Sequence, residues 1–590
     1  MSPSLPQPAR QPIAFAPSPG LPDGPVHVLK FGSSVLRGPG DLPKVAGEIY
    51  RQRRRGRRVV AVVSALEGET DRLFREAAAV GGQSSCAGVA DLVSLGEDRA
   101  AALLKLACDR IGLVATIRRA EHLGLVAGGS EVDAGFVAFA PDPIRSALEA
   151  CDVVIVPGFV GVDGGGARVL LGRGGSDYTA AILGAGLGAE CVRLYKDVDG
   201  VFERDPAEDP SARRFACLGY ADAKRLARQL VHDKAVDHAA RHGLTIEVDA
   251  IGHEDPTTIG DVPARLADPR PRSPTRIALA GYGVVGQALA RRLRDDPNFE
   301  LTSILVRDPA RQRDVPPPAP MTDRPDHFLA ADCDVLVELT SCQHTGALLC
   351  CEQLRRGRHV VTASKRLISA HFNRLRENER AGSATLRYAA AVGGSAPILE
   401  TIGQARQSAP VLEVSGILNG TVNFVLHRIA QGMDLAEALA IARDAGFAEE
   451  DSAADLSGAD AAAKLRIVAS AAFDLQPGDV SVQTEPLDEA AASRIARSGE
   501  RWVQVSTIRH DKSALVATVA LRPASQLRFP IPDDEWNLAS IRLADNTELV
   551  ARGRGAGGAA TAEAVLADLY ALAARPRAAS QPLLLNEVRA

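Results

Sequence analysis

The chain has 590 residues, of which 46% are hydrophobic and 24% charged, and its net charge is −5. This length suits about three to four folding units, and the mildly acidic balance argues against a nucleic-acid-binding protein. No uninterrupted apolar run is long enough to span a bilayer, so we expect no membrane partner. The nine cysteines form no CxxC pair, which predicts reduced thiols in a cytoplasmic protein. Residues 1–25 are proline-rich and lack the apolar core of a signal peptide, so we predict a disordered leader.

Strand-like apolar runs alternate with helical stretches through residues 26–262. The runs are "VHVLKFG", "RVVAVVSAL", "VVIVPGFVGV", "CVRLYKDV" and "LTIEVDAIG". This alternation predicts an α/β fold with a largely parallel sheet covered by helices on both faces. The basic run Arg51–Arg58, "RQRRRGRR", precedes the second of these strands. We interpret it as a solvated helix end, where arginines are favourable near the helix C-terminus.

One turn in this half places polar residues between two apolar runs. In "LLGRGGSDYTAAILGAGLGA" (170–189), Gly174 and Gly175 allow a tight turn, and Ser176 or Asp177 can cap the following helix. The free N–H groups at that helix start suit an anion. For this segment alone, a capped turn with Arg173 on the surface is the simpler interpretation.

A second α/β region begins after a short linker, and it carries a glycine signature. Gly281, Gly283 and Gly286 form G-x-G-x-x-G between a strand and a helix, the pattern of a dinucleotide-binding turn. The next strand, "LTSILVRD", ends in Arg307 and Asp308. The arginine suits a 2′-phosphate and favours NADP(H), while the aspartate leaves NAD(H) open.

The predicted domains follow from these composition changes. An α/β unit over 26–262 and a linker over 263–274 precede a Rossmann nucleotide-binding domain over 275–400. Longer helical tracts rich in Ala and Asp come after Glu400. We predict an α+β domain over 401–550, a C-terminal segment over 551–575 and a tail over 576–590; the family resemblance described below implies that the first is a catalytic and dimerisation domain and that the second returns to the nucleotide domain.

Three ordered motifs in the second half, "VVTASKRLIS", "GILNGTVNFVLHRI" and "GFAEEDSAADLSGADAAAKL", closely resemble homoserine dehydrogenases over about residues 276–572. That family reduces aspartate semialdehyde to homoserine and is built on dimers. Asp460 and Lys464 can face one site because residues i and i+4 share a helix face. Ala389 stands where the family has a glutamate of a monovalent-cation site, which argues against cation dependence. The resemblance assigns the active-site lysines Lys365 and Lys464, the substrate residues Glu449, Asp455 and Asp460, and the cofactor residues Gly281, Gly283, Val284, Val285, Gly286, Arg307, Thr340 and Lys365.

The first half resembles aspartate kinases of the amino-acid kinase fold, a three-layer sandwich. Besides GRGGSD it carries "VLKFGSSVL", "VVSALEGETDRL", "LVSLGEDRAAALL" and "LYKDVDGVFERDP" in the family's order. The resemblance implies ATP with Mg²⁺ as phosphoryl donor, with Arg173 gripping the substrate carboxylate through a two-pronged contact. It assigns Lys30 to the phosphate, Ser64, Thr70, Glu97, Arg173, Ser176 and Asp177 to the substrate, and Gly32, Ser33, Ser34, Asp197, Phe202 and Asp205 to the nucleotide.

Two departures put the kinase activity in question. The phosphate loop is one residue shorter than the family pattern, and Gln229 replaces a lysine that contacts nucleotide phosphate, with Lys234 nearby as a candidate substitute. The alternative to a bifunctional enzyme is therefore an active dehydrogenase with a catalytically impaired, structural kinase-like domain. We interpret His238 and His242 as ordinary helix histidines, because no third metal ligand accompanies them.

We expect the regulation of this chain to differ from that of bifunctional relatives that carry ACT domains between their two catalytic halves. About a dozen linker residues separate Val262 from Arg276, too few for an ACT unit. We therefore expect no ACT-mediated inhibition by threonine or lysine, and a homo-oligomer that is at least a dimer.

Overall fold

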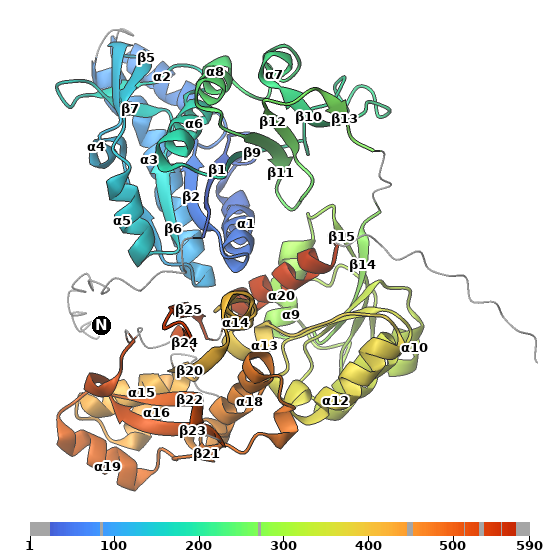
Figure 1. The fold of residues 1–590 in the computed structure, drawn as a ribbon. Coiled ribbons are helices and arrows are strands. Elements are labelled where there is room, and N and C mark those ends of the chain that lie inside the picture. Colours follow the sequence, from blue (N-terminus) through green and yellow to red (C-terminus); the bar gives the residue numbers. More distant parts are fainter. Residues whose placement is uncertain are drawn as a thin grey trace, which may run out of the picture.

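The computed structural model describes residues 24–82, 87–268, 273–444, 452–511, 514–529, 531, 536–555 and 557–573. Figure 1 shows a first half, coloured blue to green, that sits on a second half coloured lime to red. No helix among the described residues is both long and apolar enough to cross a membrane. The eight cysteines in the described part of the chain are free thiols.

The first half is built on a nine-stranded sheet with the order β13-β10-β12-β11-β9-β1-β2-β6-β3. Its neighbouring strands are parallel except for the β11–β12 and β10–β13 pairs. The strands are β1 (Val26–Phe31), β2 (Arg58–Val63), β3 (Ala115–Ile117), β6 (Val153–Pro157), β9 (Cys191–Lys196), β10 (Phe215–Gly219), β11 (Ile246–Ala250), β12 (Thr257–Gly260) and β13 (Arg265–Leu266). A small sheet joins β4 (Val126–Ser130), β5 (Asp133–Ala138), β7 (Val160–Val162) and β8 (Arg168–Leu170).

Alternate side chains of the central strands enter two different cores, as the period of two along a strand requires. Val28 and Val60 pack with residues of the helices on one face, while Leu29 and Val59 pack with those on the other. The helices of this half are α1 (Leu42–Arg54), α2 (Glu69–Ala79), α3 (Ala87–Ile111), α4 (Ala120–Leu123), α5 (Asp142–Ala150), α6 (Gly175–Leu187), α7 (Tyr220–Leu226) and α8 (Asp233–His242). The predicted α/β class with a mostly parallel sheet is confirmed.

Two details differ from the sequence-based expectation. The apolar run 153–162 is two strands, because Phe159 adopts a φ of 70° and turns the chain between β6 and β7. Strand β13 lies inside the predicted linker and pairs with β10 at the sheet edge. A short strand of two residues has too little periodicity to stand out from a linker.

The second half begins with a six-stranded parallel sheet of order β16-β15-β14-β17-β18-β19. This is the doubly wound order in which the first strand lies centrally and nucleotides bind beyond the strand ends. Its strands are β14 (Thr275–Ala280), β15 (Phe299–Leu305), β16 (Met321–Thr322), β17 (Val335–Glu338), β18 (His359–Thr362) and β19 (Leu386–Arg387), and its helices are α9 (Val284–Leu293), α10 (Pro325–Ala330), α11 (Gln343–Arg355), α12 (Lys365–Ala381) and α13 (Ala390–Gly393).

A fourth, mostly antiparallel sheet follows, with the order β21-β23-β22-β20-β24-β25. Its strands are β20 (Val411–Ile417), β21 (Gln483–Thr484), β22 (Trp502–Asp511), β23 (Ala514–Pro523), β24 (Trp536–Leu543) and β25 (Glu548–Arg554). The accompanying helices are α14 (Ile398–Ser408), α15 (Gly420–Ala430), α16 (Leu435–Asp444), α17 (Ala453–Leu456), α18 (Ala459–Phe473) and α19 (Glu489–Ser498).

The last helix, α20 (Gly558–Ala573), lies between the two halves (Figure 1). It packs against α9 of the second half and against α1 and α3 of the first. The basic run does end a helix, with Arg51 and Arg54 in the last turn of α1, but the prediction that this end is solvated is wrong, because these two arginines are 6% and 9% exposed. Arg51 lies over the ring of Tyr570 at 3.9 Å, and Arg54 pairs with Asp568 at 2.7 Å. Sequence spacing could not reveal a partner some 500 residues further along the chain.

Candidate active sites

A cavity of about 920 Å³ opens in the first half at the carboxyl ends of β1 and β9. Ligands of parallel α/β sheets bind at these strand ends. The cavity brings together residues from five separate sequence motifs. Of the predicted site residues, those that line it are Lys30, Ser33, Ser64, Thr70, Glu97, Arg173, Ser176 and Asp177.

A carboxylate bridged by two ammonium groups lies in this cavity. Asp177 Oδ1 is 2.7 Å from Lys30 Nζ, and Asp177 Oδ2 is 3.2 Å from Lys196 Nζ. Burial alone would raise the pKa of Asp177, yet Lys196 and Lys30 bring it down to about 2. Burial lowers the pKa of Lys196 to about 8. The cavity therefore holds two lysine ammonium groups that are paired with the single carboxylate of Asp177.

Lys196 is not among the site residues predicted from the sequence. It is the last residue of β9, directly before the "DVDG" motif, and it is 9% exposed. A lysine at the end of a buried parallel strand is the signal that could have found it, because lysine is almost never buried without a partner.

The glycine turn places Asp177 in the first turn of α6. Gly172 and Gly174 have φ values of 80° and 72°, a region that glycine enters without steric cost. Gly174 is the N-cap, and no side chain caps the helix. The prediction that Ser176 or Asp177 caps α6 is therefore wrong, because the Asp177 carboxylate turns to the two lysines instead.

Glu97 is a second buried carboxyl in the same cavity. Its Oε1 accepts a hydrogen bond from the Ala65 N–H at 3.2 Å, while Oε2 is buried without a hydrogen-bond partner among the described residues. Burial raises the pKa of Glu97 to about 8. An unsatisfied buried carboxyl suits a cationic ligand group, because an opposite charge nearby favours its ionised form.

Two arginines add further positive charge to the lining of the cavity. Arg173 and Arg228 line the cavity and are exposed, and no ion pair joins either to another described residue. Gln229 also lines the cavity, but Lys234 does not; it pairs with Asp133 and donates to the Leu171 carbonyl.

Some predicted nucleotide residues do not line this cavity. Asp205 accepts a hydrogen bond from Ala207 within its own turn, and Phe202 bridges to Arg214. Gly32 lies beneath Lys30, where a Cβ would lie 2.8 Å from Nζ. The residues outside the lining are Gly32, Ser34, Asp197, Phe202 and Asp205.

A second lysine–aspartate cluster lies in the other half. Asp460 Oδ1 is 2.6 Å from Lys365 Nζ, and Asp460 Oδ2 is 2.9 Å from Lys464 Nζ. Burial opposes the charge of Asp460, but Lys464 and Lys365 lower its pKa to about 2. Lys464 also donates to the Leu418 carbonyl at 2.6 Å. Lys365 begins α12 and Lys464 lies on α18, so residues about 100 positions apart converge.

Asn419 connects this cluster to Asp455. Its side-chain amide donates to Asp455 Oδ1 at 2.9 Å and to Asp460 Oδ2 at 3.3 Å, while its oxygen caps α15. Burial raises the pKa of Asp455. We had not assigned Asn419, although it stands inside the "GILNGT" motif. Glu449 lies outside the described residues.

The glycine motif opens on a cleft of about 910 Å³. Gly283 faces open space, with nothing within 4 Å of a Cβ built on it, whereas Gly281 has a φ of 99°. Among the predicted residues, the cleft is lined by Gly281, Gly283, Val284, Arg307 and Thr340 but not by Val285, Gly286 or Lys365. Arg311 and Arg313, which we had not assigned, also line it.

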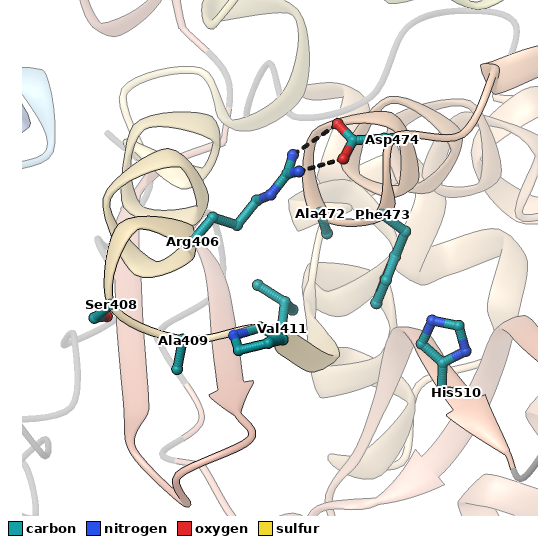
Figure 2. A pocket seen from close by; sticks show the side chains of 9 residues that line it. Arg406, Ser408, Ala409, Val411, Ala472, Phe473, Asp474 and His510 are labelled. Atoms are coloured by element: carbon teal, nitrogen blue, oxygen red, sulfur yellow. Dashed lines mark hydrogen bonds and ion pairs between the residues drawn. The ribbon is translucent and has the colours of Figure 1, made fainter.

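Other features carry no predicted site residue. Figure 2 shows a third cavity, of about 490 Å³, where Arg406 forms an ion pair with Asp474 near His510. His238 packs against Phe136 and Tyr178. In the described part of the chain, no three His, Cys, Asp or Glu side chains form a group that could hold a metal ion.

The second half has the fold and the glycine-lined cleft of a dinucleotide-binding enzyme, and it is joined to an α/β unit with its own buried lysine–aspartate cluster. Family models match in the same order: "Amino acid kinase family" over residues 25–248, "Homoserine dehydrogenase, NAD binding domain" over 281–389 and "Homoserine dehydrogenase" over 397–570. The homoserine dehydrogenase of Corynebacterium glutamicum is 31% identical over 326 residues, which are 51% of this chain and 73% of that protein. The chain belongs to the homoserine dehydrogenase family.

The first half is similar to aspartokinases. That of Thermus thermophilus is 32% identical over 235 residues, or 39% of this chain, and the chain spans 58% of that relative's length. A solved homoserine dehydrogenase from Thiobacillus denitrificans is 26% identical, covering 51% of this chain and 73% of its own, with a TM-score of 0.47.

Proposed function

We propose that this chain is a bifunctional enzyme whose first half phosphorylates L-aspartate with MgATP to give 4-phospho-L-aspartate. The observation that carries this half is the Lys30–Asp177–Lys196 cluster at the base of a cavity that also holds Arg173. Transfer of a phosphoryl group to a carboxylate gathers several negative charges, and positioned cations stabilise them.

Each cavity residue has a role that its position supports. Lys30 and Lys196 would screen the transferred phosphoryl group, and Asp177 holds both lysines in place and charged. Arg173 would bind the α-carboxylate. Glu97 would receive the α-ammonium group, since its Oε2 is otherwise unsatisfied.

We propose that the second half reduces L-aspartate 4-semialdehyde to L-homoserine. The bridging of Asp460 by Lys365 and Lys464 carries this conclusion. A bound nicotinamide supplies the hydride. Reduction of an aldehyde leaves an alkoxide, which the two ammonium groups would stabilise and protonate. Asp455, Asp460 and Glu449 would complete the contacts to the substrate amino and hydroxyl groups.

The cofactor of the second half is proposed to be NADP(H). Arg307, Arg311 and Arg313 all line the cleft beyond β15, where the ribose of a dinucleotide lies. Asp308, the residue that left NAD(H) open, accepts a hydrogen bond from Ala310 within its own turn. The open space at Gly283 suits the close approach of a pyrophosphate.

The domain limits predicted from the sequence remain proposals, as do a dimer and the place of MgATP. The product of the first half is an acyl phosphate, and the substrate of the second is an aldehyde. A separate reduction must connect them, so transfer inside one chain is not implied.

Both activities can be measured on one purified sample. Hydroxylamine trapping of aspartyl phosphate should give signal with wild type and none with Lys30→Ala. Oxidation of NADPH with aspartate semialdehyde should collapse in Lys464→Ala. Absence of hydroxamate in wild type would leave the first half without the proposed reaction, and unchanged NADPH turnover in Lys464→Ala would remove that lysine from the site.

A further inference from the structure

Glu338 is a buried carboxyl at the end of β17, and it is 1% exposed. Glutamate is almost never fully buried unless it is paired. No ion pair links Glu338 to a cation among the described residues. Its oxygens instead accept hydrogen bonds from two threonines. Hydrogen bonds, and not an opposite charge, therefore hold this buried carboxyl group in the described structure.

The two oxygens of Glu338 accept hydrogen bonds from two different segments of the chain. Oε1 accepts hydrogen bonds from the Thr340 N–H at 2.8 Å and from the Thr340 hydroxyl at 2.6 Å. Oε2 accepts one from the Thr362 hydroxyl at 2.6 Å. Thr340 lines the dinucleotide cleft, whereas Thr362 ends the neighbouring strand β18 and does not line it.

The Thr362 contact continues to the start of the active-site helix. The Thr362 hydroxyl oxygen accepts a hydrogen bond from the Ser364 N–H at 3.0 Å. Ser364 is the N-cap of α12, and its side chain accepts from the Leu367 N–H at 3.3 Å. The first residue of that helix is Lys365, which contacts Asp460.

Little space surrounds this carboxylate. A Cβ on Gly346 of α11 would lie 3.0 Å from Glu338 Oε1. The side chain is thus confined between α11 and the two strand ends, and its oxygens cannot shift without loss of a contact.

We propose that Glu338 is a positioning residue of the dehydrogenase, which fixes the cofactor-cleft loop at Thr340 relative to the helix start that carries Lys365. This inference rests on the proposed dehydrogenase function. Its physical basis is the loss of a shared acceptor: without the carboxylate, the Thr340 N–H and the buried Thr362 hydroxyl lose their hydrogen-bond partner, and the half-buried Thr340 hydroxyl keeps only the Cys342 carbonyl at 3.3 Å.

The test compares Glu338→Ala with Glu338→Gln by NADPH binding, followed through cofactor fluorescence, and by steady-state kinetics. Glu338→Ala should weaken NADPH binding and lower kcat by about ten-fold or more each, the scale of a lost hydrogen bond to a charged group. Glu338→Gln should retain NADPH binding within about three-fold, since its amide oxygen still accepts from Thr340. Aspartyl phosphate formation by the first half serves as the control for folding.

The outcomes separate this proposal from the function itself. Wild type that does not oxidise NADPH with the semialdehyde refutes the proposed function. Active wild type with an unaffected Glu338→Ala variant overturns the positioning role, and so does an equal loss in the Ala and Gln variants, which would point to charge alone. Loss of both activities in Glu338→Ala would indicate general unfolding and also count against it.

A second substitution keeps the proposal testable if Glu338→Ala does not fold. Thr362→Val should lower kcat while leaving the NADPH dissociation constant within about two-fold, because only the Lys365 side loses its link. Thr401→Val is the matched control, since Thr401 is also buried and, among the described residues, its hydroxyl donates only to the carbonyl of Pro397, the N-cap of its own helix. Equal kcat values in the two valine variants would refute the role of Glu338.

Discussion

Arg54 is a buried side chain of the first half that contacts three residues of the second half. It lies at the end of α1, donates to the Ala564 carbonyl at 3.0 Å, and forms ion pairs with Asp568 at 2.7 Å and with Glu400. Asp568 is 1% exposed. Arg54→Ala would therefore leave two carboxylates at the interface without their cation.

The size of the effect follows from burial. Removal of one partner of a buried ion pair typically costs about 3–5 kcal/mol, because the remaining charge stays desolvated and uncompensated. At a urea dependence of about 2–3 kcal/mol per molar, the unfolding midpoint should fall by roughly 1–2.5 M. Arg55→Ala is the control: Arg55 pairs with Glu254 while both side chains are about one third exposed, so its loss should cost at most about 1 kcal/mol.

The assay is urea unfolding followed by tryptophan fluorescence, since Trp502 and Trp536 both lie in the mostly antiparallel sheet of the second half. A double substitution, Arg54→Ala with Asp568→Asn, should recover part of the loss, because it removes the charge that Arg54→Ala leaves unpaired. Equal midpoints for Arg54→Ala and Arg55→Ala would refute the reasoning, as would a double variant that is less stable than the single one.

Three more outcomes concern the two sites. Aspartate binding at pH 7 should release close to one proton, because burial raises the pKa of Glu97 to about 8 and a bound ammonium group favours the charged form. Calorimetry in buffers of different ionisation enthalpy measures this release, which should be lost in Glu97→Gln. Lys196→Ala should lower hydroxamate formation by about a hundred-fold or more, and wild-type rates would exclude it from phosphoryl transfer. Arg311→Ala should reduce the preference for NADPH over NADH by about ten-fold, whereas Arg324→Ala, outside the cleft lining, should leave that ratio unchanged.

Local patterns were sufficient for much of the architecture. The apolar runs beginning at Val26 and Arg58 are strands, and the G-x-G-x-x-G turn at Gly281 does connect β14 to α9. These features depend on side-chain period and backbone freedom within a few residues. The spacing of Asp460 and Lys464 likewise predicted a shared helix face, and their side chains are 2.9 Å apart.

The convergence of distant residues required the tertiary structure. Lys196 joins Lys30 and Asp177 because β9 lies beside β1 in the sheet and α6 packs against both strands, and no spacing along the chain encodes these neighbours. Asn419 is the N-cap of α15 and Asp460 lies in the first turn of α18, so the two residues touch because the starts of these helices meet in space. The roles that the family resemblance assigns to these sites stay predictions until the activities are measured.

The sequence by itself determined which segments become strands and helices and where a dinucleotide turn forms, because these follow from periodicity and from glycine's backbone freedom over a few residues. Only the tertiary structure decided that Arg54 is buried rather than solvated and that Asp177 holds two lysines rather than capping its helix. The physical reason is that burial and pairing depend on which surfaces meet in space, and the partners of Arg54 lie some 350 and 510 residues away along the chain.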